Sequence, residues 1–292
     1  MAVYERNYGR YQGELTPSWS RFLILPRYAF KDVFDSKGFL VFLVLSCLLP
    51  FAGLILIYLH HNLAALKFLN LPLEQLQQAL PINANFFRRG LDIQSWLCFL
   101  LALSVGPSLI APDLRNNGLP LYLSRPFSRT EYVLGKMMVM IALMSFLTWI
   151  PGLLLFFFQG YLEGAGWLAA NLRIGSALFV ASWTWILVVS LVALAVSAWV
   201  KWKPVARVSL LIVFFVLTGF AAALNEALNT WWGYLFSLST AMENVRASLF
   251  GLPLNDNDLA QPVWSAWLTL TLGCVLSLWL LSRRIRAYEV VR

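Results

Sequence analysis

Charged residues are scarce in this chain of 292 residues, and they are missing from its long hydrophobic runs. Asp, Glu, Lys and Arg make up 12% of the sequence, whereas 60% of the residues are hydrophobic and the mean hydropathy is +0.69. This apolar content lies well above the usual level for soluble globular domains. The composition therefore excludes an ordinary soluble domain and indicates a membrane protein.

Cysteines and catalytic motifs are equally sparse. Cys47, Cys98 and Cys274 all lie within hydrophobic runs, where we expect small buried side chains rather than disulfides. Gly135-Lys136 lacks the upstream glycine and the following Ser or Thr of a phosphate-binding loop, so the chain is not expected to hydrolyse a nucleotide itself. We therefore predict that the chain is not an enzyme and holds no cofactor.

Two groups of side chains are candidate metal ligands. His60 and His61 are interpreted as a polar cap at the end of the first hydrophobic run, because no carboxylate or cysteine lies near them in the sequence. Met137, Met140 and Met144 share one face of a helix and are interpreted as packing residues. We expect no metal site, and a Cu(I) site on the methionine face is the alternative.

The hydrophobic residues gather into six runs, each long enough to cross a bilayer, which takes about 20 helical residues. The runs do not alternate polar and apolar residues as barrel strands would, so they are helices. The sequence predicts an all-α polytopic membrane protein with a cytoplasmic segment at 1–38, a transmembrane domain at 39–281 and a basic tail at 282–292. The runs are residues 39–59, 93–111, 137–158, 174–200, 208–224 and 263–281.

The distribution of Lys and Arg predicts the orientation. The segments 1–38, 112–136, 201–207 and 282–292 carry 17 of the 22 basic residues, which places them and both termini in the cytoplasm. The first run is too long for a signal-peptide core, so we expect it to remain in the mature protein. Anionic lipid headgroups account for the net charge of +8, and no nucleic-acid partner is expected.

Residues 16–38 mix aromatic and basic side chains. Thr16 is a plausible N-cap and Pro17 suits the first turn of a helix, so we expect an amphipathic helix in the cytoplasmic interface, kinked near Pro26. A disordered basic tail is the alternative.

The last outer connection, 225–262, is too polar for a seventh span but rich in aromatic residues. Amphipathic rings prefer the membrane interface, so we expect one or two short re-entrant or interfacial helices here. Trp231, Trp232, Tyr234 and Phe236 are the candidate residues of an outer gate.

The segment "PDLRNNGLPLYLSRPFSRTEYVLGK", residues 112–136, is a polar and basic island between two hydrophobic runs. Pro112 and Asp113 close the second run, and Ser128-x-x-Glu131 is a capping-box pattern that would begin the next helix. We expect two short elements below the membrane, separated by the turn "SRPFS". An ordinary loop on the lipid headgroups is the alternative.

This segment resembles the connection between the second and third spans in ABC-type export permeases of the type-two branch. "SRRIRAYEVVR" at the end and "RFLILPRYAFKDVFDSKGFL" near the beginning are also similar to that family. Pro120 departs from the family, which usually carries Glu at this position. The resemblance implies a coupling helix that contacts a separate ATP-hydrolysing subunit through Asp113, Leu114, Arg115, Asn117, Gly118, Leu121, Tyr122, Ser124 and Arg125.

The resemblance also implies a function and partners. The chain would be the permease of an ATP-driven exporter in a bacterial inner membrane, paired with a second copy or a different permease and with two ATPase subunits, which would hold the ATP and Mg²⁺. Apolar spans favour a lipid, drug-like or other amphipathic cargo, and polysaccharide remains open. A non-transporting scaffold or sensor, or an ion-gradient-driven carrier, is the alternative; the uncharged runs argue against the carrier.

Overall fold

The structure is a computed structural model that describes residues 23–62, 81–116, 118, 128–253 and 261–285. Within these residues the chain is helical and has no β-strand. Six helical segments are long and apolar enough to cross a membrane. The predicted fold class, an all-α chain with six spans, is confirmed, and the protein is an integral membrane protein.

Several spans consist of more than one helix. In chain order they are α2 (Lys37–His61); α5 (Ala84–Leu109) with α6 (Ala111–Arg115); α8 (Arg129–Leu147) with α9 (Trp149–Glu163); α11 (Leu172–Trp199); α12 (Lys203–Leu211), the π-helical turn η2 (Ile212–Val216) and α13 (Leu217–Leu228); and α15 (Val263–Arg284). The shorter elements are α1 (Ile24–Phe34), α10 (Ala165–Ala170), η3 (Trp232–Phe236) and α14 (Leu238–Phe250).

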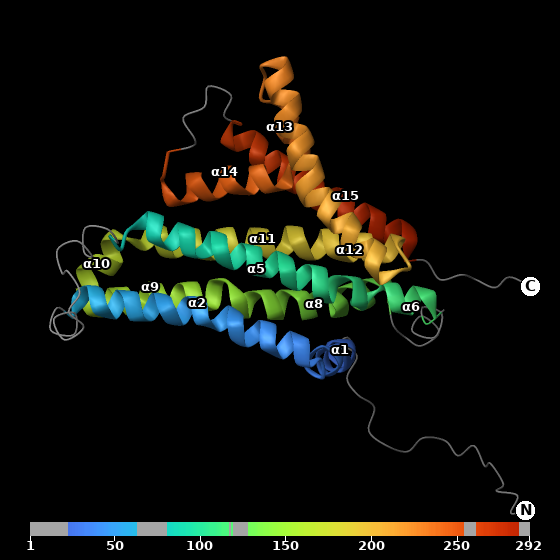
Figure 1. The fold of residues 1–292 in the computed structure, drawn as a ribbon, viewed down its shortest axis with the longest axis horizontal. Helices are drawn as coiled ribbons and strands as arrows, with labels where there is room; N and C mark the ends of the chain where they lie inside the picture. Colours follow the sequence, from blue (N-terminus) through green and yellow to red (C-terminus); the bar gives the residue numbers. More distant parts are fainter. Residues whose placement is uncertain (1–22, 63–80, 117, 119–127, 254–260, 286–292) are drawn as a thin grey trace, which may run out of the picture.

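The α11 helix is the centre of the bundle and packs against α5, α8, α9, α14 and α15 (Figure 1). Small residues allow the central helices to approach closely, as is common in membranes. A Cβ atom added to Gly106 of α5 would lie 3.0 Å from the Cβ of Ala193 on α11. The α5 and α11 helices are therefore held in direct contact.

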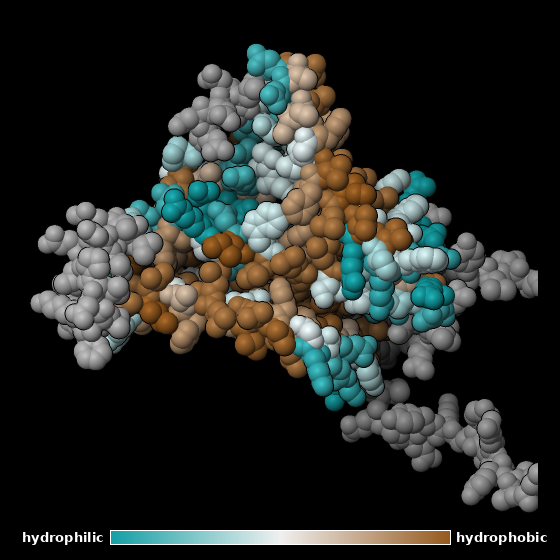
Figure 2. Space-filling view, viewed as in Figure 1, coloured by the Kyte–Doolittle hydropathy of each residue, from teal (hydrophilic) through white to brown (hydrophobic). Residues whose placement is uncertain are grey.

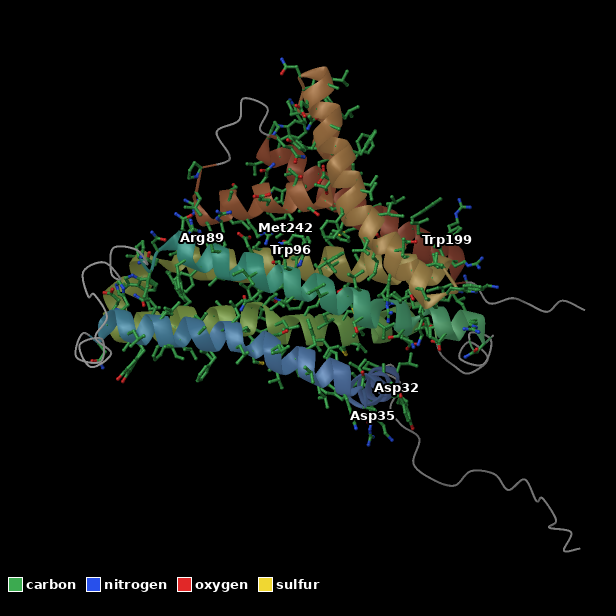
Figure 3. All side chains as sticks on the ribbon, in the orientation of Figure 1. Asp32, Asp35, Arg89, Trp96, Trp199 and Met242 are labelled. Atoms are coloured by element: carbon green, nitrogen blue, oxygen red, sulfur yellow. The ribbon has the colours of Figure 1, made fainter. Side chains whose placement is uncertain are left out.

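Charged and hydrophobic side chains occupy different regions of the surface. Hydrophobic residues cover much of the bundle between its two ends, and hydrophilic ones gather where α1 and α6 lie and also over α14 (Figure 2). This end, also the end at which α15 terminates, is called the basic end. Asp32 and Asp35 lie at the basic end and Arg89 lies towards the opposite one (Figure 3). The separation of polar ends by an apolar belt is that of a membrane-spanning bundle.

The α1 helix lies across the basic end and packs against α8 and α2. This position agrees with an interfacial N-terminal helix, although Thr16 and Pro17 lie outside the described residues. The kink expected near Pro26 stays a prediction, because the residues before position 23 lie outside the described part of the chain. Pro26 is the third residue of α1, where its missing N–H would have no partner within the helix.

Three of the predicted spans are too short, and the fifth, predicted at 208–224, extends over Lys203–Leu228. The second span begins at Ala84 rather than residue 93, and the third begins at Arg129 rather than residue 137. The added turns carry charged residues, whereas the predicted runs contain none. Asn83 caps α5 by accepting hydrogen bonds from the backbone N–H groups of Asn85 and Phe86.

Proline disturbs the second span near the basic end, and other residues compensate for the loss. Pro107 has no N–H to donate to the carbonyl of Leu103, and the Nε of Arg207 donates to that carbonyl instead, at 3.2 Å. At the break between α5 and α6, Ser197 Oγ accepts from the N–H groups of Ile110 and Ala111, at 3.3 and 3.0 Å. Both repairs come from the fourth and fifth spans.

The fifth span leans away from the other helices (Figure 1) and contains the π-helical turn η2. The carbonyl of Phe214 in this turn accepts from the hydroxyls of Thr218 and Ser239, at 2.7 and 3.1 Å. Because Ser239 belongs to α14, this contact ties the turn to the segment that follows α13. π-Helical turns are frequent at functional sites.

The expected short helices between the fifth and sixth spans are present as η3 and α14. The α14 helix packs against α11, α15 and α5 rather than standing apart from the bundle. Its N-cap is Ser237, whose side chain accepts from the N–H of Thr240, and its C-cap is Gly251, with φ +71°. Its position brings side chains of the connection between the fifth and sixth spans against the second and fourth spans.

Candidate functional site

The connection between the second and third spans begins and ends at a buried ion pair. The Nζ of Lys136 on α8 lies 2.9 Å from the Oδ2 of Asp113 on α6, and the hydroxyl of Tyr132 donates to the same oxygen at 2.6 Å. The side chains of Asp113 and Lys136 are 18% and 10% exposed. The two ends of the connection are thus joined by charge-assisted hydrogen bonds in a largely dry environment.

The helix after the connection starts as predicted. Glu131 N–H donates to Ser128 Oγ at 3.2 Å, and Ser128 N–H donates to Glu131 Oε2 at 2.6 Å. These reciprocal bonds are a capping box, and the prediction for Ser128 and Glu131 is confirmed. The cap fixes the point at which the chain re-enters α8.

The residues assigned to an ATPase contact are only partly described. Asp113 is engaged in the internal ion pair, and Leu114 is half-buried and packs on the core, whereas Arg115 is exposed. Gly118 is half-buried. The remaining candidates, Asn117, Leu121, Tyr122, Ser124 and Arg125, and the departure at Pro120, lie outside the described residues.

A cavity of about 730 Å³ adjoins the ion pair at the basic end. It lies between α1, α2, α5, α8 and α12, and its lining includes Tyr28, Asp32, Lys203 and Arg207. The cavity separates part of α1 from the fifth span, so these elements do not form a continuous packed layer at this end.

The four aromatic residues assigned to an outer gate lie on and beside η3. Trp231 and Trp232 stack with ring centroids 4.8 Å apart, and Trp231 meets the edge of Trp264 at 6.2 Å. Trp232 and Phe236 are exposed, and Tyr234 is half-buried. The cluster joins the ends of α13 and α15; its function as a gate remains a prediction.

The side chains weighed as metal ligands have other contacts. Met140 and Met144 are fully buried, and the Sδ of Met144 accepts from the hydroxyl of Ser190 at 3.7 Å. His61 lies 3.4 Å from the carboxylate of Glu163, a neighbour that the sequence order did not suggest. Within the described residues no group of three His, Cys, Asp or Glu side chains is placed to hold a metal ion.

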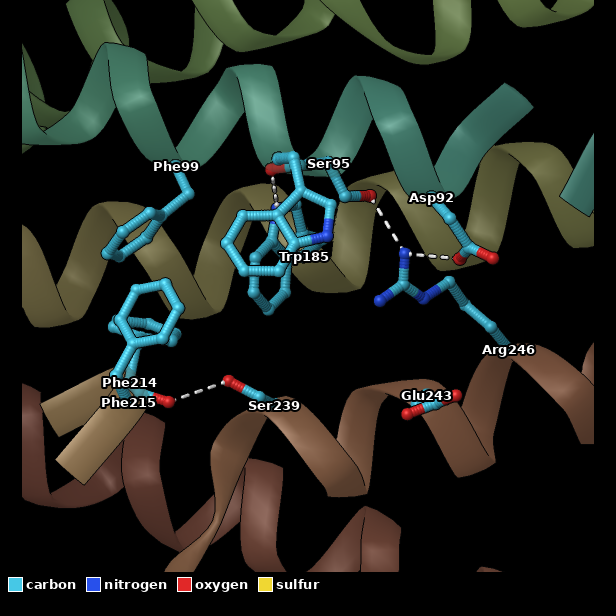
Figure 4. A pocket seen from close by; sticks show the side chains of 10 residues that line it. Asp92, Ser95, Phe99, Trp185, Phe214, Phe215, Ser239, Glu243 and Arg246 are labelled. Atoms are coloured by element: carbon cyan, nitrogen blue, oxygen red, sulfur yellow. Dashed lines mark hydrogen bonds and ion pairs between the residues drawn. The ribbon is translucent and has the colours of Figure 1, made fainter. Parts of the chain in front are cut away.

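A second polar site, not predicted from the sequence, lies between α5, α11, η2 and α14 (Figure 4). It surrounds a cavity of about 240 Å³. Asp92 lies eight residues after the start of α5, about 12 Å along the helix and directly before the hydrophobic run 93–111, so the site lies near the end of the second span opposite to the basic end. Its lining comprises Asp92, Ser95, Trp96, Phe99, Trp185, Phe214, Phe215, Ser239, Glu243 and Arg246.

Arg246 is the central charge of this site. Its Nη1 lies 2.8 Å from the Oδ1 of Asp92 and donates to the Oγ of Ser95 at 3.0 Å. Its guanidinium lies over the ring of Trp185, with Cζ 5.7 Å from the ring centroid. Burial lowers the pKa of Arg246, and the nearby carboxylate of Asp92 opposes that shift.

Ser95 connects three helices at this position. Its carbonyl accepts from the indole Nε1 of Trp185 on α11 at 3.1 Å, while its hydroxyl accepts from Arg246 on α14. Asp92 also lies 3.5 Å from Arg88, one helical turn earlier. The buried charges are therefore balanced within a network that fixes α14 to the bundle.

Part of this site could have been found in the sequence. Asn83 is a recognisable N-cap, and Arg88 and Asp92 have the spacing of a helical ion pair. Arg246 gives no local signal, because its partners lie about 150 residues earlier in the chain. Only tertiary packing shows that a basic residue of the outer loop is buried against the second span.

Comparisons with known proteins do not assign a family. A scan of the chain against protein-family models found no match, and a search among curated proteins found no similar sequence.

Proposed function

We propose that this chain is the permease subunit of an ATP-driven exporter of the ABC class, located in a bacterial inner membrane and working with a separate ATP-binding subunit. The proposal combines the six-span fold with the resemblance of residues 112–136 to the coupling segment of such permeases. The observation that carries it is the ion pair of Asp113 with Lys136, which joins the second and third spans on either side of that segment.

The mechanism follows from this connection. A partner that pushes on residues 116–128 applies force to two helix ends that are tied together, so α6 and α8 move as a unit. The break at Ile110 and the proline at Pro107 lie next to α6, where the second span can bend if the bonds of Ile110 and Ala111 to Ser197 are released. ATP-driven closure of two partner subunits would thus bias a two-state membrane element formed by two permeases.

Removing side chains from the segment tests this proposal. The triple variant Leu121→Ala, Tyr122→Ala, Arg125→Ala should lose the ATPase subunit from the complex purified from its native host, or should retain it with ATP hydrolysis no longer coupled to transport. The matched control is Leu172→Ala, Tyr161→Ala, Arg89→Ala, which removes the same residue types from exposed positions away from the basic end.

Two results would contradict the proposal. The triple variant would retain full ATP-driven transport, or no ATP-hydrolysing subunit would accompany the unaltered protein. The control variant must behave like the unaltered protein for the comparison to count, because an equal loss in both would indicate damage to the fold.

One observation favours a second candidate function. Carriers driven by ion gradients use ionisable groups within their spans, and Asp92 lies in the α5 helix of the second span, paired with Arg246, although the predicted spans carried no charge. A carrier of this kind would transport its substrate in vesicles depleted of ATP and would stop when the ion gradient is collapsed. An ATP-driven exporter gives the opposite result in both conditions.

A further inference from the structure

We propose that the cavity around Arg246 is a binding site for an amphipathic oxyanion, a carboxylate or phosphate joined to an apolar tail. The binding is a property of this chain alone. That the bound molecule is a substrate for export rests on the proposed function.

The first argument is the unused half of the guanidinium. Nη1 makes the contacts with Asp92 and Ser95, whereas the buried Nε has no hydrogen-bond partner in the described part of the chain. Nε and Nη2 form the second donor pair of the planar guanidinium, and this pair matches the two oxygens of a carboxylate or phosphate. Arg246 lines the cavity but its Nε is buried, so a bound oxyanion would reach both donors after the guanidinium turns toward the cavity.

The second argument is the apolar wall beside these donors. Phe99 and Phe214 are buried at its base, with ring centroids 5.1 Å apart. Trp96 and Phe215 lie at 5.4 Å from each other and are 57% and 43% exposed, so they flank the side of the cavity that faces the surroundings of the bundle. An apolar tail would lie against the exposed faces of these two rings and extend toward the lipid while its head remains at Arg246.

The third argument is the placement of charge: two arginines and two carboxylates balance around the cavity, and an anion is favoured at Arg246 itself, where the donors without a partner lie. The carboxylate of Asp92 already has two arginine partners, Arg88 and Arg246, and offers little to an incoming cation. Glu243 lines the same cavity one turn before Arg246 and is exposed. Its negative charge competes with any anion that approaches the guanidinium, so its removal should strengthen binding.

Equilibrium binding to the full-length protein in phosphatidylcholine nanodiscs tests the site. The probes are radiolabelled decanoate and decyl phosphate, with decyltrimethylammonium as the cation of matched tail and inorganic phosphate as the anion without a tail; empty nanodiscs give the blank. We expect one saturable site for the two anionic amphiphiles, and at least tenfold weaker binding of the cation and of inorganic phosphate.

Variants then assign the site to Arg246. Arg246→Gln and Arg246→Lys should each weaken binding of decanoate about tenfold or more, since Lys keeps the charge without the paired donors. Arg89→Gln, an exposed arginine of the same helix as Asp92 but outside the cavity, should have no effect. Glu243→Gln should tighten binding several-fold, and this exposed substitution remains informative if the Arg246 variants do not fold.

Three results would overturn the proposal: equal binding of the cation, binding of decanoate that is insensitive to both the Arg246 and the Glu243 substitutions, or no saturable binding. Displacement of decanoate by phosphatidic acid would identify a membrane lipid as the source of the oxyanion, and its absence would identify a single-tailed molecule. Because no ATPase subunit is present, the result is independent of the test of the coupling segment.

Discussion

The ion pair of Asp113 with Lys136 allows a quantitative prediction, because both side chains are mostly buried. Lys136 and the hydroxyl of Tyr132 contact the same carboxylate oxygen of Asp113. Lys136→Met leaves the carboxylate with a single hydroxyl donor. Removing one partner of a buried pair costs about 3–5 kcal/mol, and we expect about 3 kcal/mol here because Asp113 is still 18% exposed. At about 2 °C per kcal/mol for a chain of this size, Tm should fall by about 6 °C.

The assay is thermal unfolding of the purified protein in detergent, followed by tryptophan fluorescence. The double variant Asp113→Asn, Lys136→Met should be no less stable than Lys136→Met alone, because it leaves no uncompensated charge. Lys201→Met, at an exposed position, serves as the control and should change Tm by less than about 1 °C. Strictly additive losses in the double variant would refute the pairing, as would an unchanged Tm for Lys136→Met.

Two further predictions concern backbone groups, and thermal unfolding checks both. Arg207→Gln should lower the free energy of unfolding by about 1–2 kcal/mol, because it removes the donor to the carbonyl of Leu103. The loss should be smaller in a Pro107→Ala background, where the new amide N–H of residue 107 can donate to that carbonyl. An equal loss in both backgrounds would contradict this account. Gly233→Ala should lower Tm, since its Cβ would lie 2.5 Å from the Oδ1 of Asn225, whereas Gly219→Ala, with nothing within 4 Å, should not; equal Tm values would contradict the packing argument.

Hydropathy located the spans well where their ends are set by the residues themselves. The first span, predicted at 39–59, is the helix Lys37–His61 in the structure, and the fourth, predicted at 174–200, is the helix Leu172–Trp199. The capping box at Ser128 and Glu131 was also accessible, because its two members are three residues apart. Local signals of this kind need no knowledge of the tertiary structure.

The buried charges could not be predicted in the same way. A hydropathy criterion assigns each charged residue a cost that ignores its partners, and it therefore ended the second span at residue 93. Asp92 is tolerated within α5 because Arg246, from a different part of the chain, neutralises it at 2.8 Å. The argument against a carrier, which depended on spans without charge, loses its basis for the same reason.

The contacts of α5 indicate which parts of the bundle can move. Trp185 and Ser197 of α11 bond to α5 at Ser95 and at its junction with α6, about 22 Å apart along the helix. Helices joined at two heights and in close contact at Gly106 can shift against each other only by breaking several buried bonds.

The fifth span has the opposite character. It leans away from the bundle, most of its large side chains are exposed, and its π-helical turn meets α14 through the hydroxyl of Ser239. Since Phe214 and Phe215 of that turn form one wall of the cavity, a tilt of the fifth span would open or close the site, while the wall carrying Asp92 stays fixed to α11. In the proposed exporter, a force at the basic end that tilts the fifth span would change access to Arg246 while Asp92 keeps its contact with the guanidinium.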